Sequence, residues 1–104
     1  MTALQGLKAI DLSRNRIANW PEGKLEGLDF LTSINLHANN IEWIHPAVFA
    51  GLKSLTHLDL SKNRLKKFEG YYYLSGLQVL NLNMNHLTDL GNATMMGMSG
   101  AMIF

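Results

Sequence analysis

Two aspartates and two histidines are the residues whose types and spacing could support catalysis or metal binding. Asp11 and Asp59 occupy equivalent places in a repeating pattern, and paired carboxyl groups can carry out acid–base hydrolysis. The repeat places them two strands apart, roughly 10 Å, on an open surface without an apolar pocket to separate their pKa values. His37 and His57 fall on adjacent strands near Asp59, without H-x-x-x-H spacing or a third close ligand. We therefore predict no catalytic centre, no metal site and no cofactor.

Asn92-Ala93-Thr94 forms the N-x-T motif that accepts N-linked glycans. The motif is short and common, and it has meaning only in a chain that enters the secretory pathway. Asn92 is therefore a candidate glycosylation site.

Length, charge and composition exclude several classes of protein. The 104 residues allow one domain, and nine Lys and Arg against eight Asp and Glu leave a net charge of only +1. This balance argues against a dedicated surface for nucleic acid or anionic membranes. No apolar run approaches the roughly 20 residues that span a bilayer, and residues 1–6 lack the basic and apolar regions of a secretory signal. The absence of cysteine excludes disulfides and thiolate metal sites.

An eleven-residue pattern recurs four times and supplies the elements that would position these side chains. The pattern L-x-x-L-x-L-x-x-N-x-L, with Ile at some Leu positions, begins at Leu7, Leu31, Leu55 and Leu77, at spacings of 24, 24 and 22 residues. Numbering the positions one to eleven, position nine is Asn15, Asn39, Asn63 and Asn85. Counting onward places Leu90, Met95 and Met98 at core positions, and Ala101 and Phe104 at positions one and four of a partial fifth copy. We predict a single array over residues 1–104, with repeats at about 7–30, 31–54, 55–76 and 77–100 and a partial repeat at each end.

The spacing within each copy is typical of a short, half-buried strand. Positions four and six are apolar and alternate with polar positions, so one side of each strand points inward. Strands of this length bury their apolar side only when they stack in parallel and share a core. The asparagine at position nine follows the strand, where its side chain can donate and accept hydrogen bonds to turn backbone and link neighbouring repeats. We predict a structural asparagine ladder of Asn15, Asn39, Asn63 and Asn85.

These motifs, with the return pattern I-x-x-I-x-P-x-x-F-x-G-L from Ile41 to Leu52, resemble the leucine-rich repeat family. The 24-residue copies are similar to the repeats of animal extracellular and receptor ectodomains. The resemblance implies an α/β-type solenoid with short parallel strands on a concave face, loops or 3₁₀ turns on the convex face, and little regular α-helix. It also implies non-enzymatic recognition of a protein or peptide partner in an extracellular or receptor location. From the charge balance and the lack of a long apolar run, we expect no nucleic acid binding and no membrane insertion by this segment.

The outward-facing strand positions and the turn after each strand form rows across the concave face. Their polar side chains could contact a partner, or the acidic and basic rows could pair with each other across strands. The residues we predict for partner binding are Asp11, Arg14, Arg16, Asn35, His37, His57, Asp59, Lys62, Arg64 and Asn81.

The two ends of the chain lack the cysteine-rich caps of the extracellular subclass. Three interpretations therefore remain open: a segment of a longer ectodomain, a designed or minimal scaffold without a natural ligand, or a protein whose open ends pair with a partner. Self-association through the ends is part of the alternative hypothesis of a structural scaffold.

Overall fold

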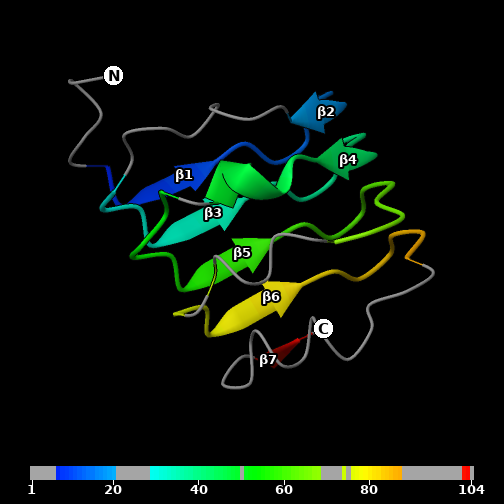
Figure 1. Cartoon of the computed structure of the whole chain (residues 1–104). Coiled ribbons are helices and arrows are strands. Elements are labelled where there is room, and N and C mark those ends of the chain that lie inside the picture. The colour runs from blue at the N-terminus through cyan, green and yellow to red at the C-terminus, as the bar shows by residue number, and fades with distance from the viewer. Residues whose placement is uncertain are drawn as a thin grey trace.

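The chain folds into short parallel strands stacked one repeat beside the next, as the computed structural model shows (Figure 1). The structure describes residues 7–20, 29–49, 51–68, 74, 76–87 and 102–103. The elements are β1 (Ala9–Asp11), β2 (Asn19–Trp20), β3 (Ser33–Asn35), β4 (Trp43–Ile44), the 3₁₀ helix η2 (Pro46–Phe49), β5 (His57–Asp59), β6 (Val79–Asn81) and β7 (Met102–Ile103). No helix in this part of the chain is long and apolar enough to cross a membrane.

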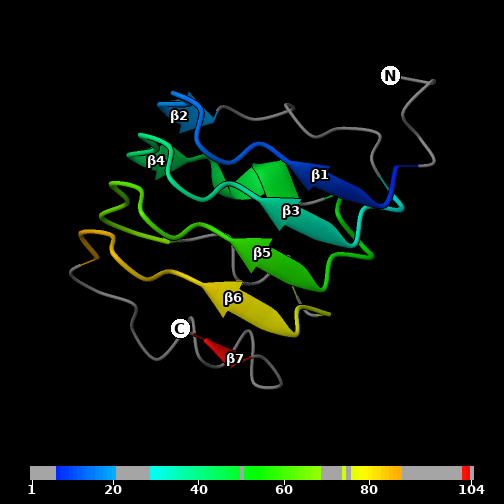
Figure 2. The same ribbon diagram turned by 180° about the vertical axis from the view of Figure 1, so that it is seen from behind.

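The main sheet has the strand order β1-β3-β5-β6-β7, with every neighbouring pair parallel. Positions three, four and five of one repeat pair with the same positions of the next, so Ile34 pairs with Leu58 and Leu58 with Leu80. The view from behind shows the same order of strands, with η2 on one side of the sheet (Figure 2). The predicted solenoid of short parallel strands is confirmed.

The apolar positions of the pattern build the core between the sheet and the return segments. In the second and third repeats, positions one, four, six and eleven are buried, and Phe49 and Phe68 from the return segments pack with ring centroids 5.9 Å apart. Ile10 and Leu12 of the first repeat are only partly buried against this core. Burial of the leucine positions therefore explains why the pattern needs aliphatic residues there.

The asparagines at position nine connect neighbouring repeats. Nδ2 of Asn63 donates to the carbonyl oxygens of Leu36 and Leu60, both at 3.0 Å, while its Oδ1 accepts from the backbone N–H of Ile41 at 3.1 Å. Asn39 and Asn85 make the same bridges one repeat earlier and one repeat later. Asn15 bonds only to carbonyls of its own repeat among the described residues. These side chains satisfy buried backbone groups that the turn leaves without strand partners.

A second parallel pair, β2 with β4, was not expected from the sequence, which predicted only loops or 3₁₀ turns in the return segments. Asn19 pairs with Trp43 and Trp20 with Ile44, in each case 24 residues apart. Because the first two repeats have equal length, the same return positions lie side by side, and their backbones pair. The 3₁₀ helix η2 fits the expectation for this face.

The predicted register of the partial fifth repeat was wrong by one residue. Met102 pairs with Val79 and Ile103 with Leu80, so position four falls on Ile103 and not on Phe104. The expected position one at Ala101 lies outside the described residues. Return segments differ in length between repeats, and a count across one of them does not fix strand register. The core positions expected for Leu90, Met95 and Met98 lie outside the described residues.

Candidate protein interface on the sheet

Position five of each repeat holds the turn that follows its strand. In every case the side-chain Oδ1 accepts a hydrogen bond from the backbone N–H two residues later, which is the Asx turn that Asp and Asn form readily. The acceptor oxygens belong to Asp11, Asn35, Asp59 and Asn81, and the N···O distances lie between 2.9 and 3.0 Å. One oxygen of each side chain is thus committed to the fold, and no described residue hydrogen-bonds to its second polar atom, which is available for contacts on the open face.

Asp11 lies on β1, apart from the other acidic member of this row. The Ser13 hydroxyl and the Ser13 backbone N–H lower the pKa of Asp11, and the Arg14 charge adds to this. Each of these groups favours the ionised carboxylate. In sheet order β3 separates β1 from β5, so Asp11 and Asp59 do not form a carboxylate pair.

His37, Ser61 and Asp59 form a hydrogen-bonded chain across two strands. The Ser61 hydroxyl donates to Oδ1 of Asp59 at 2.6 Å, and Nδ1 of His37 lies 2.6 Å from the same hydroxyl oxygen. Because a hydroxyl has one proton and Ser61 gives it to a carboxylate, Ser61 accepts from an Nδ1–H of His37. This order of donors differs from a nucleophilic triad, in which histidine accepts the serine proton. These hydrogen bonds therefore fix the orientation of the His37 ring.

His57 is held in the same way by its neighbour. The Thr56 hydroxyl donates to the carbonyl oxygen of Thr32 at 3.1 Å, and Nδ1 of His57 lies 2.9 Å from Thr56 Oγ1. Since the threonine proton is committed, His57 donates through Nδ1. In the neutral ring, Nε2 of His57 is then an acceptor that faces away from this contact.

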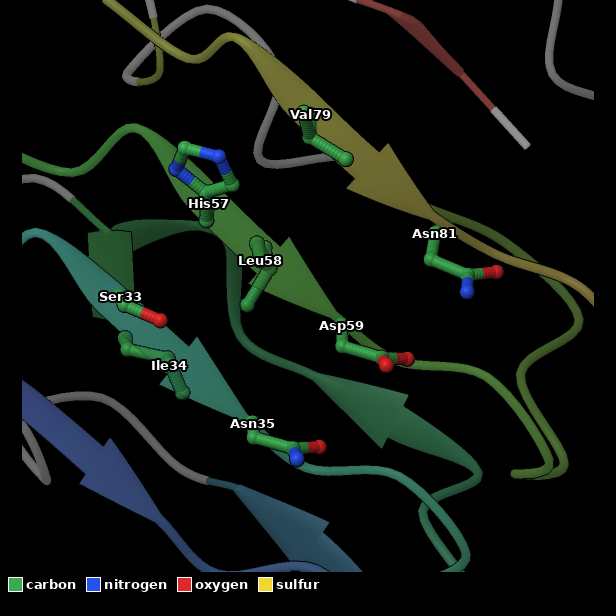
Figure 3. Close-up of a pocket in the computed structure, with 8 residues that line it drawn as sticks. All are labelled: Ser33, Ile34, Asn35, His57, Leu58, Asp59, Val79 and Asn81. Carbon is green, nitrogen blue, oxygen red and sulfur yellow. The ribbon is translucent and has the colours of Figure 1, made fainter.

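A depression of about 310 Å³ lies on the open face of the sheet over β3, β5 and β6 (Figure 3). Position three contributes Ser33, His57 and Val79, and position five contributes Asn35, Asp59 and Asn81, while Ile34 and Leu58 complete the floor between them. Ile34 and Leu58 are almost fully buried, so the six outward side chains define what this surface offers to a partner.

The structure brings together only some of the residues that the sequence indicated. Asn35, His57, Asp59 and Asn81 line the depression, and His37 reaches Asp59 through Ser61. The four cationic residues at positions eight and ten lie in the turn after the strand, are exposed and do not line the depression: Arg14, Arg16, Lys62 and Arg64. Position eight itself has a left-handed backbone, with φ of 58° at Arg14 and 55° at Lys62.

Four residues that shape this face were not among those predicted from the sequence to bind a partner. Ser33 and Val79 line the depression, and Thr56 and Ser61 orient the two histidines. Ser33 and Val79 share position three with His57, so the row itself was the available signal. In the described ranges no three His, Cys, Asp or Glu residues come together as metal ligands. Asn92 lies outside the described residues.

Comparison with known proteins identifies the repeat. The family model described as "Leucine rich repeat" matches residues 5–65, and a model described as "Leucine Rich repeats (2 copies)" matches residues 53–94. Chicken keratocan is 42% identical over 64 residues, covering 60% of this chain. Toll-like receptor 7 of Drosophila melanogaster is 36% identical over 93 residues, covering 81% of it. The rat leucine-rich repeat-containing G-protein coupled receptor 5 is 38% identical over 92 residues, covering 88%.

The matched segment is a small part of each of these relatives. The chain spans 18% of keratocan, 6% of the Toll-like receptor and 9% of the G-protein coupled receptor. The matching family model covers more than half of the 104 residues, and the stacked parallel strands have the pattern's register. The chain therefore belongs to the leucine-rich repeat family.

Proposed function

We propose that this chain is a non-enzymatic recognition module that binds a protein or peptide partner through the concave face of its sheet. The observation that carries the proposal is the pre-organised polar surface over β3, β5 and β6. Hydrogen bonds within the fold hold His57, Asp59 and the two flanking asparagines in place, so little side-chain entropy is lost when a partner binds.

The named relatives support a role of this class. Two of them are receptors by name, and the chain resembles a short stretch of each. We infer from this that the chain works as part of an extracellular or receptor-type repeat domain.

The chemistry of the face supports binding more than catalysis. Ser61 gives its proton to Asp59 and accepts from His37, so the hydroxyl is not activated as a nucleophile. The depression is open on the sheet surface, where water has access and no reactant is sequestered.

Selection of random twelve-residue peptides displayed on phage, against the immobilised 104-residue chain, tests this role. Each enriched peptide is then measured against His57→Ala/Val79→Ser, which alters the depression without touching an Asx turn. The matched control is Lys66→Ala/Lys67→Ala, because both lysines are exposed on the return segment. We expect binding to fall at least about tenfold in the first variant and to stay unchanged in the control. Enriched peptides that tolerate the first variant as well as the control would overturn the assignment of this face.

A further inference from the structure

Asp59 carries a carboxylate oxygen that the fold leaves unused. Its Oδ1 accepts from the Ser61 N–H at 2.9 Å and from the Ser61 hydroxyl at 2.6 Å. Among the described residues, neither a hydrogen bond nor an ion pair engages Oδ2. Asp59 is half-buried and is the one acidic residue among those that line the depression. A partly desolvated carboxylate oxygen that no cation of the described residues engages favours a cation from outside the chain.

The depression has an apolar end and a polar end. His57 and Val79 pair directly across β5 and β6, and they place an imidazole ring beside an aliphatic side chain. Asp59 lies two residues further along β5 on the same face, about 6.6 Å away at 3.3 Å per residue. That separation matches the reach of an extended side chain with an apolar stem and a cationic head.

The two asparagines beside Asp59 supply donors of fixed orientation. Asn35 and Asn81 pair with Asp59 in the strand register, one on each side. Since their Oδ1 atoms accept backbone N–H groups and no described residue engages their Nδ2 groups, these groups can donate outward. Carbonyl oxygens of a peptide backbone are suitable acceptors for these donors, while the peptide's side chain reaches Asp59.

The ring of His57 discriminates between the two kinds of cationic side chain. Its Nδ1 is held by Thr56, so the neutral ring offers Nε2 as an acceptor and its face for stacking. A guanidinium group stacks on aromatic faces and presents five N–H donors in a planar fork, whereas an ammonium group is a strongly hydrated point charge. The surroundings of Asp59 therefore suit arginine better than lysine.

We propose that the depression over β3, β5 and β6 is a subsite for an arginine side chain of a peptide partner. Its guanidinium pairs with Asp59 and stacks on the ring of His57, and its stem lies along Val79. The proposal rests on the recognition role of this face and names the chemistry of the partner.

An NMR titration of the ¹⁵N-labelled 104-residue chain tests the subsite with small probes. The probes are N-acetyl-arginine amide, the neutral and nearly isosteric N-acetyl-citrulline amide, and N-acetyl-lysine amide. We expect saturable shifts at the amides of β5 and β6 with the arginine probe, and affinity about tenfold weaker for citrulline, because a charge-assisted hydrogen bond is lost. The lysine probe is expected to bind more weakly than the arginine probe.

The Asp59→Asn variant isolates the carboxylate. Asparagine already occupies position five at Asn35 and Asn81 and accepts the same turn hydrogen bond there, so the variant keeps the fold. Asp11→Asn is the matched control, since it removes the same charge from the same row outside the depression. We expect about tenfold weaker binding of the arginine probe to Asp59→Asn and unchanged binding to Asp11→Asn.

Three results would overturn the arginine subsite: no saturable shifts at the depression, equal affinity for citrulline or lysine, or equal effects of the two Asn variants. The peptide selection separates this failure from failure of the proposed function. Selected peptides that need His57 and Val79 but contain no required arginine would remove the arginine subsite and leave the recognition role standing.

Discussion

At the level of single residues, the turn after each strand uses unusual backbone geometry. Position eight is left-handed in all four repeats, with φ of 58°, 59°, 55° and 58° at Arg14, Ala38, Lys62 and Met84. None of these is glycine or asparagine, so each turn carries a steric cost. The backbone N–H of Ala38 still donates to the Ser61 carbonyl of the next repeat at 3.0 Å. The strained turn thus keeps the repeats connected and turns the chain so that position nine enters the core.

Ala38→Gly should raise the free energy of unfolding by about 0.5–1 kcal/mol. Relief of the left-handed conformation is worth about 1–2 kcal/mol, and glycine's greater freedom in the unfolded chain offsets roughly half of it. Ala18→Gly is the control, because Ala18 is exposed and its φ is not positive. This control should lose about 0.5–1 kcal/mol in urea denaturation. A loss of stability in both variants would contradict the steric explanation.

The two concave histidines should be protonated at Nδ1 in their neutral form. Ser61 and Thr56 have given their hydroxyl protons to Asp59 and to the Thr32 carbonyl, so each accepts from a histidine Nδ1–H. Long-range ¹H–¹⁵N correlation spectra at alkaline pH report the tautomer directly. Ser61→Ala should release His37 alone, and Thr56→Val should release His57 alone, so each variant is the control for the other. Dominant Nε2–H tautomers in the parent chain would rule out this hydrogen-bond order.

At the level of elements, the asparagine of each repeat joins three-residue strands into one sheet. Strands this short have few ladder hydrogen bonds, and the turn after them leaves backbone groups facing the core. Asn63 is buried and bridges two repeats, whereas Asn15 is exposed and, within the part of the chain that the structure describes, bonds only to Leu12 and Ser13. Two asparagines at the same position of the pattern therefore contribute differently to stability.

Asn63→Ala should lower the free energy of unfolding by about 1–3 kcal/mol, because it leaves the buried Ile41 N–H without a partner. The Leu36 and Leu60 carbonyls each lose one of two side-chain amide donors and keep the other, from Asn39 and Asn85. Asn15→Ala should cost less than about 1 kcal/mol, since water replaces its bonds. Chemical denaturation of both variants, with amide exchange at Ile41 as a local probe, measures the difference. Equal losses would show that the bridge between repeats adds nothing to the bonds within a repeat.

At the level of the whole molecule, the burial of equivalent apolar positions differs between repeats. Ile34 and Leu36 are 1% exposed between two neighbouring strands, while Ile10 and Leu12 are only partly buried against the same core. In a solenoid, each repeat contributes its own stability and the energy of its interfaces. The third repeat, which lies at the centre of the depression, is one of these well-covered repeats and supports the proposed binding surface.

Ile34→Ala should cost about 2–5 kcal/mol, as expected for a fully buried aliphatic side chain. Ile10→Ala, at the same position of the first repeat, should cost about 1–2 kcal/mol because less apolar area is removed from the core. Thermal and urea unfolding of the two variants, followed by circular dichroism, provides the comparison. Equal costs would mean that the first repeat is covered as well as the second.

The sequence by itself determined the repeat, its apolar positions and the asparagine at position nine. These follow from local spacing, since positions four and six alternate with polar residues and recur at intervals of 22 to 24 residues. It also indicated the rows of side chains on the open face, because residues at one position of parallel strands lie next to each other. This reasoning predicted four of the residues that line the depression: Asn35, His57, Asp59 and Asn81.

Only the tertiary structure decided which side chains on the open face line one depression and which hydrogen-bond to each other. The β2–β4 pair, the register of β7, the left-handed turns and the hydroxyl bonds to His37 and His57 all depend on contacts between repeats. The four cations at positions eight and ten looked equivalent to strand residues in the pattern, yet the turn carries them past the depression. Sequence spacing fixes which side of a strand a residue faces, whereas the path of the turn and the pairing of neighbouring strands fix where its polar atoms point.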